Sequence, residues 1–414
     1  MGSGFAGPTQ LTGASFYWNP AVVGLDPNDY IAALDLGIAN VRLNYQRAPD
    51  PLTRNVPYEP ASSNTWAGNP IFTLAGPLVH DYVQWVAGGY SPSGTSVNWP
   101  PDGSQRYNGS YGSVLSYMLG AGLVLTPDRV ISVAALIGYT YGFLTLKESV
   151  DMASFVDAKL GPGAVDYEKP ALEARMTILG HGGGPAAIFA LQLRPIPGLT
   201  LAASMNLLTP LNLSGTLTLA GASGLHQTLP GWNLSPNGNV NINYKLPFEL
   251  HFEIDAREGP WHFSPMFWWS DAHVTSTIVA NVTQASSLLI AGQQISIKGT
   301  NDVWGAGARI TRVIDSQWEL AFRIDYHADS VPTATMSATN VDFTRWDFTG
   351  GARYHIDEHY AVTLTYLLMY CVPKLVTDSV FNPTTPSSSG LSMASTNGLY
   401  SGFANWLVLG FERT

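Results

Sequence analysis

Long stretches of this chain alternate between apolar and polar residues with a period of two, which is the pattern of a β-strand with two different faces. In residues 318–327 one face carries the apolar side chains Trp318, Leu320, Phe322, Ile324 and Tyr326. Residues 241–255 and 345–357 repeat the pattern. Strands of soluble sandwiches usually run about five or six residues. These stretches run roughly ten to fifteen, the length that a tilted strand needs to cross a bilayer.

The composition fits a chain that lies in a membrane without membrane helices. Only 12% of the residues are charged, about half the usual share of a soluble globular protein, while 45% are hydrophobic. The longest stretch without a charged residue, 195–244, is broken by Pro, Asn, Ser and Gly, and holds no solid apolar run of helix-spanning length. Because only helices and closed barrels satisfy every backbone group in lipid, we expect a closed β-barrel.

The connections between the predicted strands alternate between short turns and long polar loops. Short turns are expected at residues 77–81, 126–129, 194–198, 257–260, 313–317 and 356–359. Long loops are expected near residues 48–70, 92–110, 147–170, 209–240, 275–300, 328–342 and 373–397. Outer-membrane barrels have short periplasmic turns and long external loops. The sequence therefore predicts an all-β fold, a transmembrane antiparallel β-barrel of about 14 strands in a bacterial outer membrane.

The N-terminal residues 1–28 do not fit this pattern. They show little alternation, are rich in small residues and Pro, and carry no charge before Asp26. A barrel of this strand number is wide enough to need filling. We therefore predict two parts, a hatch or plug of residues 1–28 inside the lumen and a barrel of residues 29–414. Since the chain begins with neither a basic nor an apolar signal region, we expect a mature form from which the signal peptide is absent.

Charge and spacing argue against several kinds of chemistry. The net charge of −10 argues against nucleic acid as a partner, and Cys371 alone allows no internal disulfide. The nine histidines show no metal-binding spacing. A G-x-G-x-x-G match at residues 2–7 lacks the preceding strand of a nucleotide site, and the Gly-rich run after His181 has no G-x-S-x-G elbow to accompany it. We predict a protein that is not an enzyme, with no catalytic residue, metal or cofactor.

Two departures from the alternation indicate what such a barrel would do. The third predicted strand ends at Gly88, Gly89 and Pro92, which mark either an ordinary strand end or a break in the wall through which an apolar molecule leaves sideways. Some apolar residues also occupy positions that should face a wet lumen, among them Leu136, Leu367 and Met369. They indicate an apolar passage, although packing against the plug would require the same residues.

The N-terminal segment resembles that of the FadL/TodX family of outer-membrane transporters. Residues 4–7 (GFAG) and 15–21 (SFYWNPA) are similar to the Gly/Ala-rich stretch and the aromatic-Asn-Pro-Ala motif with which those proteins begin. Residues 90–94 resemble an element that follows their third strand. Members are fourteen-stranded barrels with an N-terminal hatch, and they import long-chain fatty acids or aromatic hydrocarbons. Family chains usually end on an aromatic residue, whereas here Glu412, Arg413 and Thr414 follow Phe411.

The resemblance implies roles for particular residues. The hatch and the ligand pocket beside it would include Phe16, Trp18, Asn19 and Pro20 together with the inward Leu136, Leu367 and Met369. External loops three and four would capture the ligand on Met152, Phe155, Val156, Leu160, Leu225, Leu229 and Trp232. Lateral exit would occur at Gly88, Gly89 and Pro92. The partners would be a hydrophobic small molecule and outer-membrane lipid, and the barrel would be a monomer.

Three other functions stay open at this point. A porin for polar solutes predicts rings of inward charge and a large steady conductance. An outer-membrane enzyme acting on lipids requires a His near a Ser on one patch, for which His181 and His251 are the candidates. In a surface-interaction barrel the long loops would carry the function.

Overall fold

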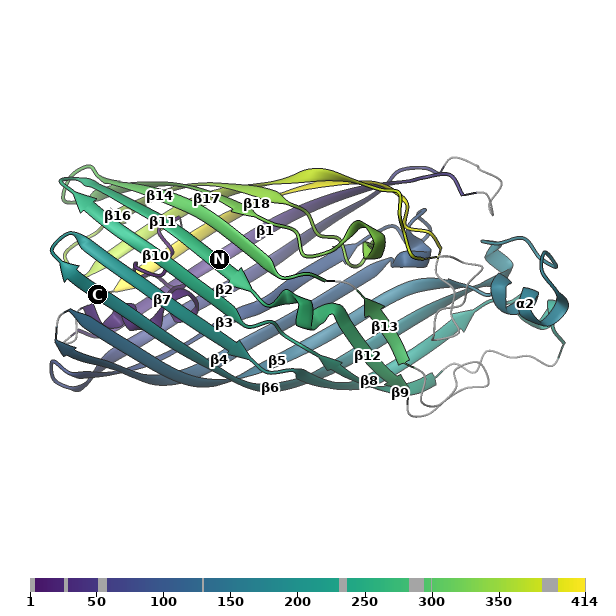
Figure 1. Cartoon of the computed structure of the whole chain (residues 1–414), viewed down its shortest axis with the longest axis horizontal. Coiled ribbons are helices and arrows are strands. Elements are labelled where there is room, and N and C mark those ends of the chain that lie inside the picture. The colour runs from purple at the N-terminus through teal and green to yellow at the C-terminus, as the bar shows by residue number, and fades with distance from the viewer. Residues whose placement is uncertain are drawn as a thin grey trace.

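A single antiparallel sheet that closes on itself makes up most of the chain (Figure 1). The computed structural model describes residues 4–25, 29–50, 58–128, 130–230, 237–282, 294–298, 300–381 and 394–413. The strands are β1 (Ile31–Arg47), β2 (Ala61–Val79), β3 (Val83–Asn98), β4 (Tyr111–Asp128), β5 (Ile131–Asp151), β6 (Glu173–Ile196), β7 (Leu199–Leu208), β8 (Leu211–Gly221), β9 (Asn237–Tyr244), β10 (Glu249–Glu258), β11 (Trp261–Ser270), β12 (Thr277–Val282), β13 (Gln294–Lys298), β14 (Val303–Val313), β15 (Trp318–His327), β16 (Arg345–His355), β17 (Tyr360–Val376) and β18 (Gly398–Arg413). The α-helices are α1 (Ser15–Trp18), α2 (Ala153–Leu160) and α3 (Leu225–Thr228), and the 3-10 helices are η1 (Pro20–Leu25), η3 (Arg106–Asn108), η4 (Pro170–Leu172), η5 (Ala272–Ser276) and η6 (Thr333–Thr335).

These eighteen strand segments form fourteen strands of the barrel, because four of the strands are interrupted once. One half of β6 pairs with β7 and the other half with β8. In the same way β10 continues β9, β12 continues β11, and β14 continues β13, since β10 and β11 pair on one side of the break and β9 and β12 on the other. Pairing of β18 with β1 closes the barrel. The predicted barrel of about 14 strands is confirmed.

The barrel has a turn end and a loop end (Figure 1). All six predicted short turns join consecutive strands, for example between Val79 and Val83 and between Glu258 and Trp261. They gather at the left of Figure 1, whereas the long connections and α2 lie at the right. The alternation of short and long connections in the sequence therefore assigns the connections to the two ends of the barrel correctly.

Two rows of outward aromatic side chains mark the width of the membrane-facing wall. Toward the loop end, rings of Trp304 and Trp346 lie 5.2 and 5.1 Å from the ring of Tyr326 between them. Trp269 extends this row, because its strand pairs it with Trp304. At the turn end Trp318 lies 4.8 Å from Tyr354. Such rows are typical of the interfaces on either side of a bilayer.

The four interruptions lie beyond the loop-end aromatic row. Strands β8, β9, β12 and β13 therefore extend the wall past the membrane-facing band, together with the loop-end halves of β5 and β6. Within the described residues, no helix is long and apolar enough to cross a membrane.

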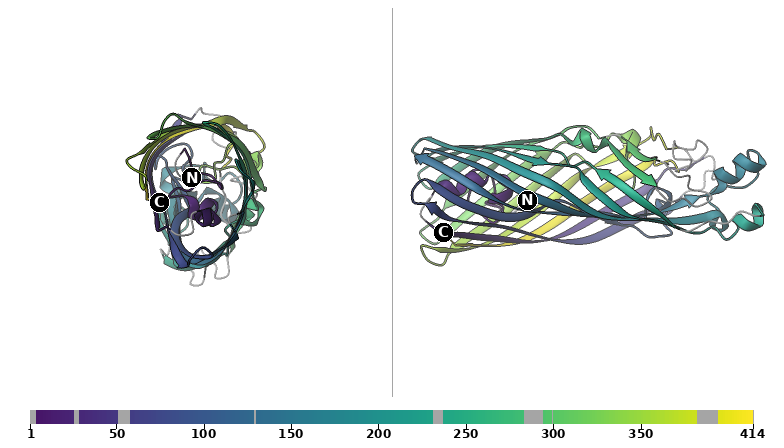
Figure 2. Two further views of the ribbon diagram at one scale, coloured as in Figure 1. Left: turned by 90° about the vertical axis from the view of Figure 1, so that its left-hand side faces the viewer. Right: turned by 90° about the horizontal axis from the view of Figure 1, so that it is seen from below.

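The N-terminal residues 4–25, here called the lumenal segment, lie inside the ring of strands (Figure 2, left). Almost all of their side chains are buried, including Phe5, Phe16, Trp18 and Val22. The segment carries α1 and η1 and fills the lumen nearer the turn end (Figures 1 and 2). Its division from the barrel at residue 28 stays a prediction, because residues 26–28 lie outside the described ranges.

Candidate functional site

One side of the lumenal segment is held by arginines that bond to its backbone carbonyl groups. Arg309 Nη1 donates to Phe5 O at 2.8 Å, and Arg323 Nη1 donates to Ala6 O at 2.8 Å. The guanidinium of Arg353 stacks over the Phe5 ring at 4.4 Å. Hydrogen bonds from charged donors are roughly twice as strong as neutral ones, so these contacts fix the first residues of the segment against the wall.

Buried carboxylates neutralise these arginines and add bonds of their own. Arg309 Nη2 lies 3.0 Å from Glu253 Oε1, with both side chains at most 1% exposed. The Glu253 carboxylate also accepts from N and Oγ1 of Thr9, at 2.7 and 2.8 Å. Arg323 Nε pairs with Asp325 at 2.6 Å. A buried charge is tolerated when it is paired and hydrogen-bonded, and each of these groups meets that condition.

The C-terminal tail belongs to the same network. Phe411 faces outward with 43% of its surface exposed, whereas Glu412 faces the lumen and is buried. Its carboxylate lies 3.0 Å from Arg353 Nη2, and Arg353 also pairs across strands with Glu319 at 3.3 Å. The inward charges of Arg353, Glu319 and Glu412 therefore pair with one another, and the tail that departs from the family pattern contributes one of the partners.

The opposite side of the lumenal segment is held by close packing against glycines. A Cβ atom added at Gly88 would lie 2.4 Å from the Phe16 ring, and one added at Gly120 would lie 3.2 Å from it. Thr73 Oγ1 accepts a hydrogen bond from Phe16 N at 2.8 Å and donates one to Gly13 O at 2.9 Å. The absence of side chains at the two glycines creates the space that the aromatic ring fills.

Phe16 belongs to an apolar cluster that joins the lumenal segment to the wall. Of the residues predicted to line a ligand pocket, Phe16, Trp18 and Leu136 all lie in this cluster. Met369 packs instead against a second cluster near the loop end, and Leu367 is half-buried at a lumen-facing position of β17. The structure therefore brings together only part of the predicted pocket.

Asn19 of the Asn-Pro-Ala motif is a fully buried hydrogen-bonding centre. Its Nδ2 donates to Pro8 O at 2.9 Å and to Leu191 O of β6 at 3.2 Å, while its Oδ1 accepts from Ala21 N at 3.0 Å. Pro20 follows at the first position of η1, where its missing N–H costs nothing. The motif thus folds the segment back on itself and attaches it to the wall.

The wall beside Phe16 has a gap between β2 and β3. The β2–β3 ladder runs from Val79/Val83 to Phe72/Gly89. Beyond that point the structure describes both strands, 61–71 of β2 and 90–98 of β3, and no ladder pair joins them. Pro92 lies in a bulge, since β3 advances from Tyr90 to Ser93 while β4 advances by two residues. A hydrogen bond from Asn98 N to Ser63 Oγ, 2.9 Å long, crosses at the far end of the gap.

The residues predicted to capture a ligand gather in one apolar cluster at the loop end. Met152, Val156, Leu225 and Leu229 are buried in it, Phe155 packs on it half-buried, and Leu160 is 56% exposed. Helices α2 and α3 place these side chains against the inner face of the extended wall, which supplies Met176, Leu213 and Ile242. Trp232 lies outside the described residues.

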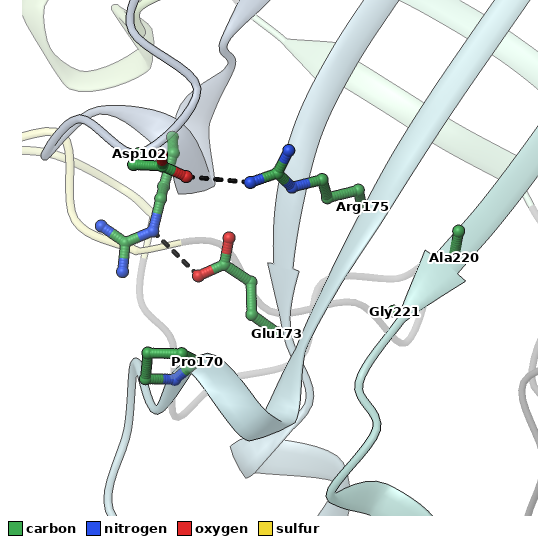
Figure 3. A pocket seen from close by; sticks show the side chains of 7 residues that line it. Asp102, Pro170, Glu173, Arg175, Ala220 and Gly221 are labelled. Carbon is green, nitrogen blue, oxygen red and sulfur yellow. Dashed lines mark hydrogen bonds and ion pairs between the residues drawn. The ribbon is translucent and has the colours of Figure 1, made fainter.

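A polar pocket of about 470 Å³ lies beside this cluster (Figure 3). Its lining residues are Asp102, Arg106, Pro170, Glu173, Arg175, Ala220 and Gly221. Glu173 accepts from Ser149 at 2.6 Å and from Arg106 at 2.9 Å, and Arg175 pairs with Asp102 at 2.9 Å. Although burial opposes it, the bonds from Ser149 and Arg106 hold the pKa of Glu173 below its ordinary value. The charges of the pocket therefore satisfy one another.

The structure also brings a serine and a histidine together, as a lipid-acting enzyme would require. Ser204 Oγ lies 3.1 Å from His251 Nδ1, and His251 Nε2 lies 3.7 Å from Glu249. However, the Ser204 hydroxyl donates its one proton to the Trp18 carbonyl. The imidazole cannot accept that proton at the same time, so this group tethers the lumenal segment and does not form an activated nucleophile. His181 lies elsewhere, bonded to Tyr141.

The side chains of Asp271, His273 and Asp302 lie close together at the loop end. One carboxylate oxygen of each aspartate and one imidazole nitrogen, atoms of the kinds that bind metal ions, all lie within 4.8 Å of one another. His273 Nδ1 lies 2.7 Å from Asp302, and this hydrogen bond raises the pKa of the exposed imidazole above its ordinary value. The histidine thereby ties the end of β11 to the start of β14. Sequence spacing missed this group because an interrupted strand pair separates its members.

The structure defines a class of protein, a fourteen-stranded barrel whose lumen is filled by its own N-terminal segment. A Pseudomonas aeruginosa FadL homologue has a similar fold, with a TM-score of 0.84, 15% sequence identity, and coverage of 100% of this chain and 96% of that chain. The Pseudomonas putida toluene transporter TodX has a TM-score of 0.70 and 12% sequence identity, with coverage of 98% of this chain and 94% of that chain. The Ralstonia pickettii toluene transporter TbuX has a TM-score of 0.67 and 13% sequence identity, with coverage of 100% of this chain and 96% of that chain. The family resemblance is thus confirmed at the level of the fold.

No protein-family model matches the sequence, and no curated protein matches it either.

Proposed function

We propose that this protein is a passive channel of the bacterial outer membrane for hydrophobic molecules, long-chain fatty acids or related apolar compounds. The solved structures with this fold include proteins described as toluene transporters and monoaromatic hydrocarbon channels. The loop end would face the outside of the cell and the turn end the periplasm.

The observation that carries the proposal is the position of the β2–β3 gap beside the apolar cluster of the lumenal segment. The Phe16 ring packs against Gly88, one residue before the last β2–β3 ladder pair. The Tyr17 ring lies 4.9 Å from the ring of Tyr90, the first residue of β3 beyond that pair. A polar solute gains no binding free energy from aromatic rings at an opening toward lipid. An apolar molecule gains there, since burying each methylene is worth about 0.8 kcal/mol.

The path of the ligand would have three stages. It would bind at the apolar cluster of α2 and α3, move to the apolar cluster at Phe16, and leave through the β2–β3 gap into the bilayer. Phe16 and Trp18 would act as the hatch, and a small shift of α1 would open the space that the Phe16 ring fills. Since no energy source is involved, the ligand would move down its own concentration gradient.

The bulge at Pro92 allows a sharp test. Deleting Pro92 equalises the residue counts of β3 and β4 between the ladder pairs Tyr90/Met118 and Ser93/Ser116, and leaves the faces of both halves of β3 unchanged. We expect β3 to straighten and pair with β2, and uptake of labelled fatty acid or toluene to fall to that of cells without the protein. Pro92→Ala keeps the extra residue and is the matched control, with uptake closer to wild type.

Unchanged uptake in the deletion, with the barrel folded and present in equal amount, would show that the gap is not the exit. Uptake of polar sugars with a large steady conductance in planar bilayers would favour the porin alternative. Comparing fatty acid with toluene in the same cells decides between the two substrate classes.

A further inference from the structure

The outer face of the barrel carries an apolar groove of about 490 Å³ on β6, β7, β10 and β11. It is lined by Leu191, Leu193, Leu201, Ala202, Ala203, Phe252, Glu253, Ile254, Pro265, Met266 and Phe267. Ala203 pairs with Leu191 on one neighbouring strand and with Phe252 on the other, so a small side chain lies between two larger ones in this lining. Glu253 is the one charged residue of the lining, and its carboxylate is already bonded to Arg309 and Thr9 on the lumen side.

The groove lies in the middle of the membrane-facing band. Trp261 and Trp269 stand at the two ends of β11, and Pro265 lies midway between them. Phe252, Ile254 and Phe267 are all more than 40% exposed on this face. The medium next to the groove is therefore the hydrocarbon of the bilayer.

A proline lies where the ladder between β10 and β11 is interrupted. The β10–β11 register passes from Glu253/Met266 to Ala256/Phe263, and no ladder pair joins Ile254 with Pro265 or Asp255 with Ser264, all of which the structure describes. Proline has no N–H to donate, so it interrupts the ladder inside a sheet. Met266 consequently lines the outer groove although it belongs to the apolar cluster inside the barrel.

The inner side of the same wall carries the lumenal segment. Asn19 donates to Leu191 O, and Ser204, next to Ala203, donates to Trp18 O. The groove thus lies directly behind the part of the segment that follows Phe16, on a different stretch of wall from the β2–β3 gap. This arrangement requires only that the barrel spans a bilayer, whatever it transports.

We propose that the groove is a binding site for the acyl chain of a bilayer lipid, which seals the wall where Pro265 interrupts the ladder. A void in contact with hydrocarbon loses the dispersion contacts that a chain would restore. No side chain of the lining is a hydrogen-bond donor or a cation that could hold a headgroup, so the chain is the part of the lipid that the groove recognises. A second copy of the barrel would need a ridge to enter this concave surface, whereas a flexible chain adapts to it.

The experiment uses the whole chain refolded into liposomes whose phospholipids carry a diazirine on one acyl chain. After irradiation, labelled residues are mapped by mass spectrometry. We expect labelling of 199–208, 249–258 and 261–270 to exceed that of the lipid-facing residues of β17, such as Leu364 and Leu368.

Two variants test the site itself. Ala203→Phe fills the groove and should lower its labelling about ten-fold, the order expected when an overpacked site must give way. Ala135→Phe adds the same ring on the exposed face of β5 and should leave groove labelling unchanged. Pro265→Val restores a donor at the break and should also lower the labelling, which keeps the proposal testable if Ala203→Phe does not fold.

Equal labelling of the groove and of β17 would overturn the proposal, as would labelling that Ala203→Phe and Pro265→Val do not change. Cross-links from the groove to a second protein molecule would assign it to a copy of the chain and equally overturn it. None of these outcomes depends on uptake, so a failure here is distinct from a failure of the channel proposal.

Discussion

The two sides of the lumenal segment are attached to the wall by different kinds of interaction. Toward β10, β14, β15 and β16, its carbonyl groups accept bonds from Arg309 and Arg323, whose charges are neutralised by buried carboxylates. Toward β2, β3 and β4, it is held by the fit of Phe16 against Gly88 and Gly120 and by two bonds to Thr73. We call these the charged side and the packed side.

The difference teaches which part of the segment can move. Breaking a buried ion pair leaves a buried charge without its partner, which costs several kcal/mol, about 3–5. The charged side therefore has no alternative position of low free energy. An aromatic ring changes rotamer at small cost if space is available, so the packed side can shift while the charged side holds. The wall gap lies on the packed side, where such a shift would have a consequence.

The largest effect is expected from Arg309→Met on the charged side. It leaves the Glu253 carboxylate buried without a countercharge, and the free energy of unfolding should fall by about 3–5 kcal/mol. Tryptophan fluorescence during denaturant unfolding in micelles or liposomes measures this. The double variant Arg309→Met/Glu253→Gln should recover most of the loss. Equal losses in the single and the double variant would show that the pair does not anchor the segment.

A smaller loss is expected from Gly88→Val on the packed side. The new Cβ would lie 2.4 Å from the Phe16 ring, so the ring must leave its place, at a cost of up to about 3 kcal/mol. Gly350→Val is the matched control, since a Cβ at Gly350 meets no atom within 4 Å. The same unfolding measurement applies to both variants. Gly88→Val should also change uptake, whereas Gly350→Val should not, and equal behaviour of the two would contradict the packing account.

Thr73→Val tests the hydrogen bonds of the packed side without changing its volume much. It removes the bonds to Phe16 N and Gly13 O, and should lower stability by about 1 kcal/mol for each bond. Thr73→Ser keeps the hydroxyl and should stay near wild type. Hydrogen exchange of residues 13–18 checks whether the loss is local. A loss spread evenly over the barrel would argue against the assigned role.

The smallest effect concerns the loop end, where attachment depends on pH. Asp151 lies at the outer end of β5 and accepts from Ala153 N at 2.9 Å and from Glu168 N at 2.7 Å. The pKa of Asp151 is raised from 3.8 to about 6, and burial of the carboxylate is the largest cause. The two hydrogen bonds and the neighbouring Glu173 change the pKa by less. The folded state therefore binds a proton more tightly than the unfolded state, and the loop should lose stability as pH rises from about 4 to 6.

Hydrogen exchange of residues 153–172, corrected for the intrinsic pH dependence of exchange, measures this effect. Asp151→Asn should flatten the pH profile over that window. Asp102→Asn, which removes an exposed carboxylate at the same end of the barrel, should not. A profile that both variants leave unchanged would assign the effect to another group.

The period-two pattern predicted most of the wall. It placed Trp318, Leu320 and Phe322 on one face of β15, and all three are exposed there. The six short turns were equally accessible, because each is bounded by a change from alternation to turn residues. These features depend on local sequence, and the pleat of a strand fixes them without knowledge of its neighbours.

The contacts between the lumenal segment and the wall could not be predicted in the same way. Alternation shows that Arg323 and Glu253 face inward, but it does not show which carbonyl or which residue lies across the lumen from them. The interruptions of four strands also escaped, since Thr209 and Pro210 fell at the start of a predicted loop and Pro247 fell within the alternating stretch 241–255. Capture residues such as Val156 were predicted as a surface for a ligand, and the structure places this side chain inside an apolar cluster instead.

The anchoring of the lumenal segment has a consequence for the order of folding. Its first residues are bonded to partners that the chain reaches only 244 to 361 residues later, among them Glu253, Arg309 and Thr365. Contacts across such separations form late, because the loop between them must close first. The lumenal segment precedes all fourteen strands in the chain and is therefore the last to find its place, because it can do so only when β18, which carries Glu412, has closed the ring.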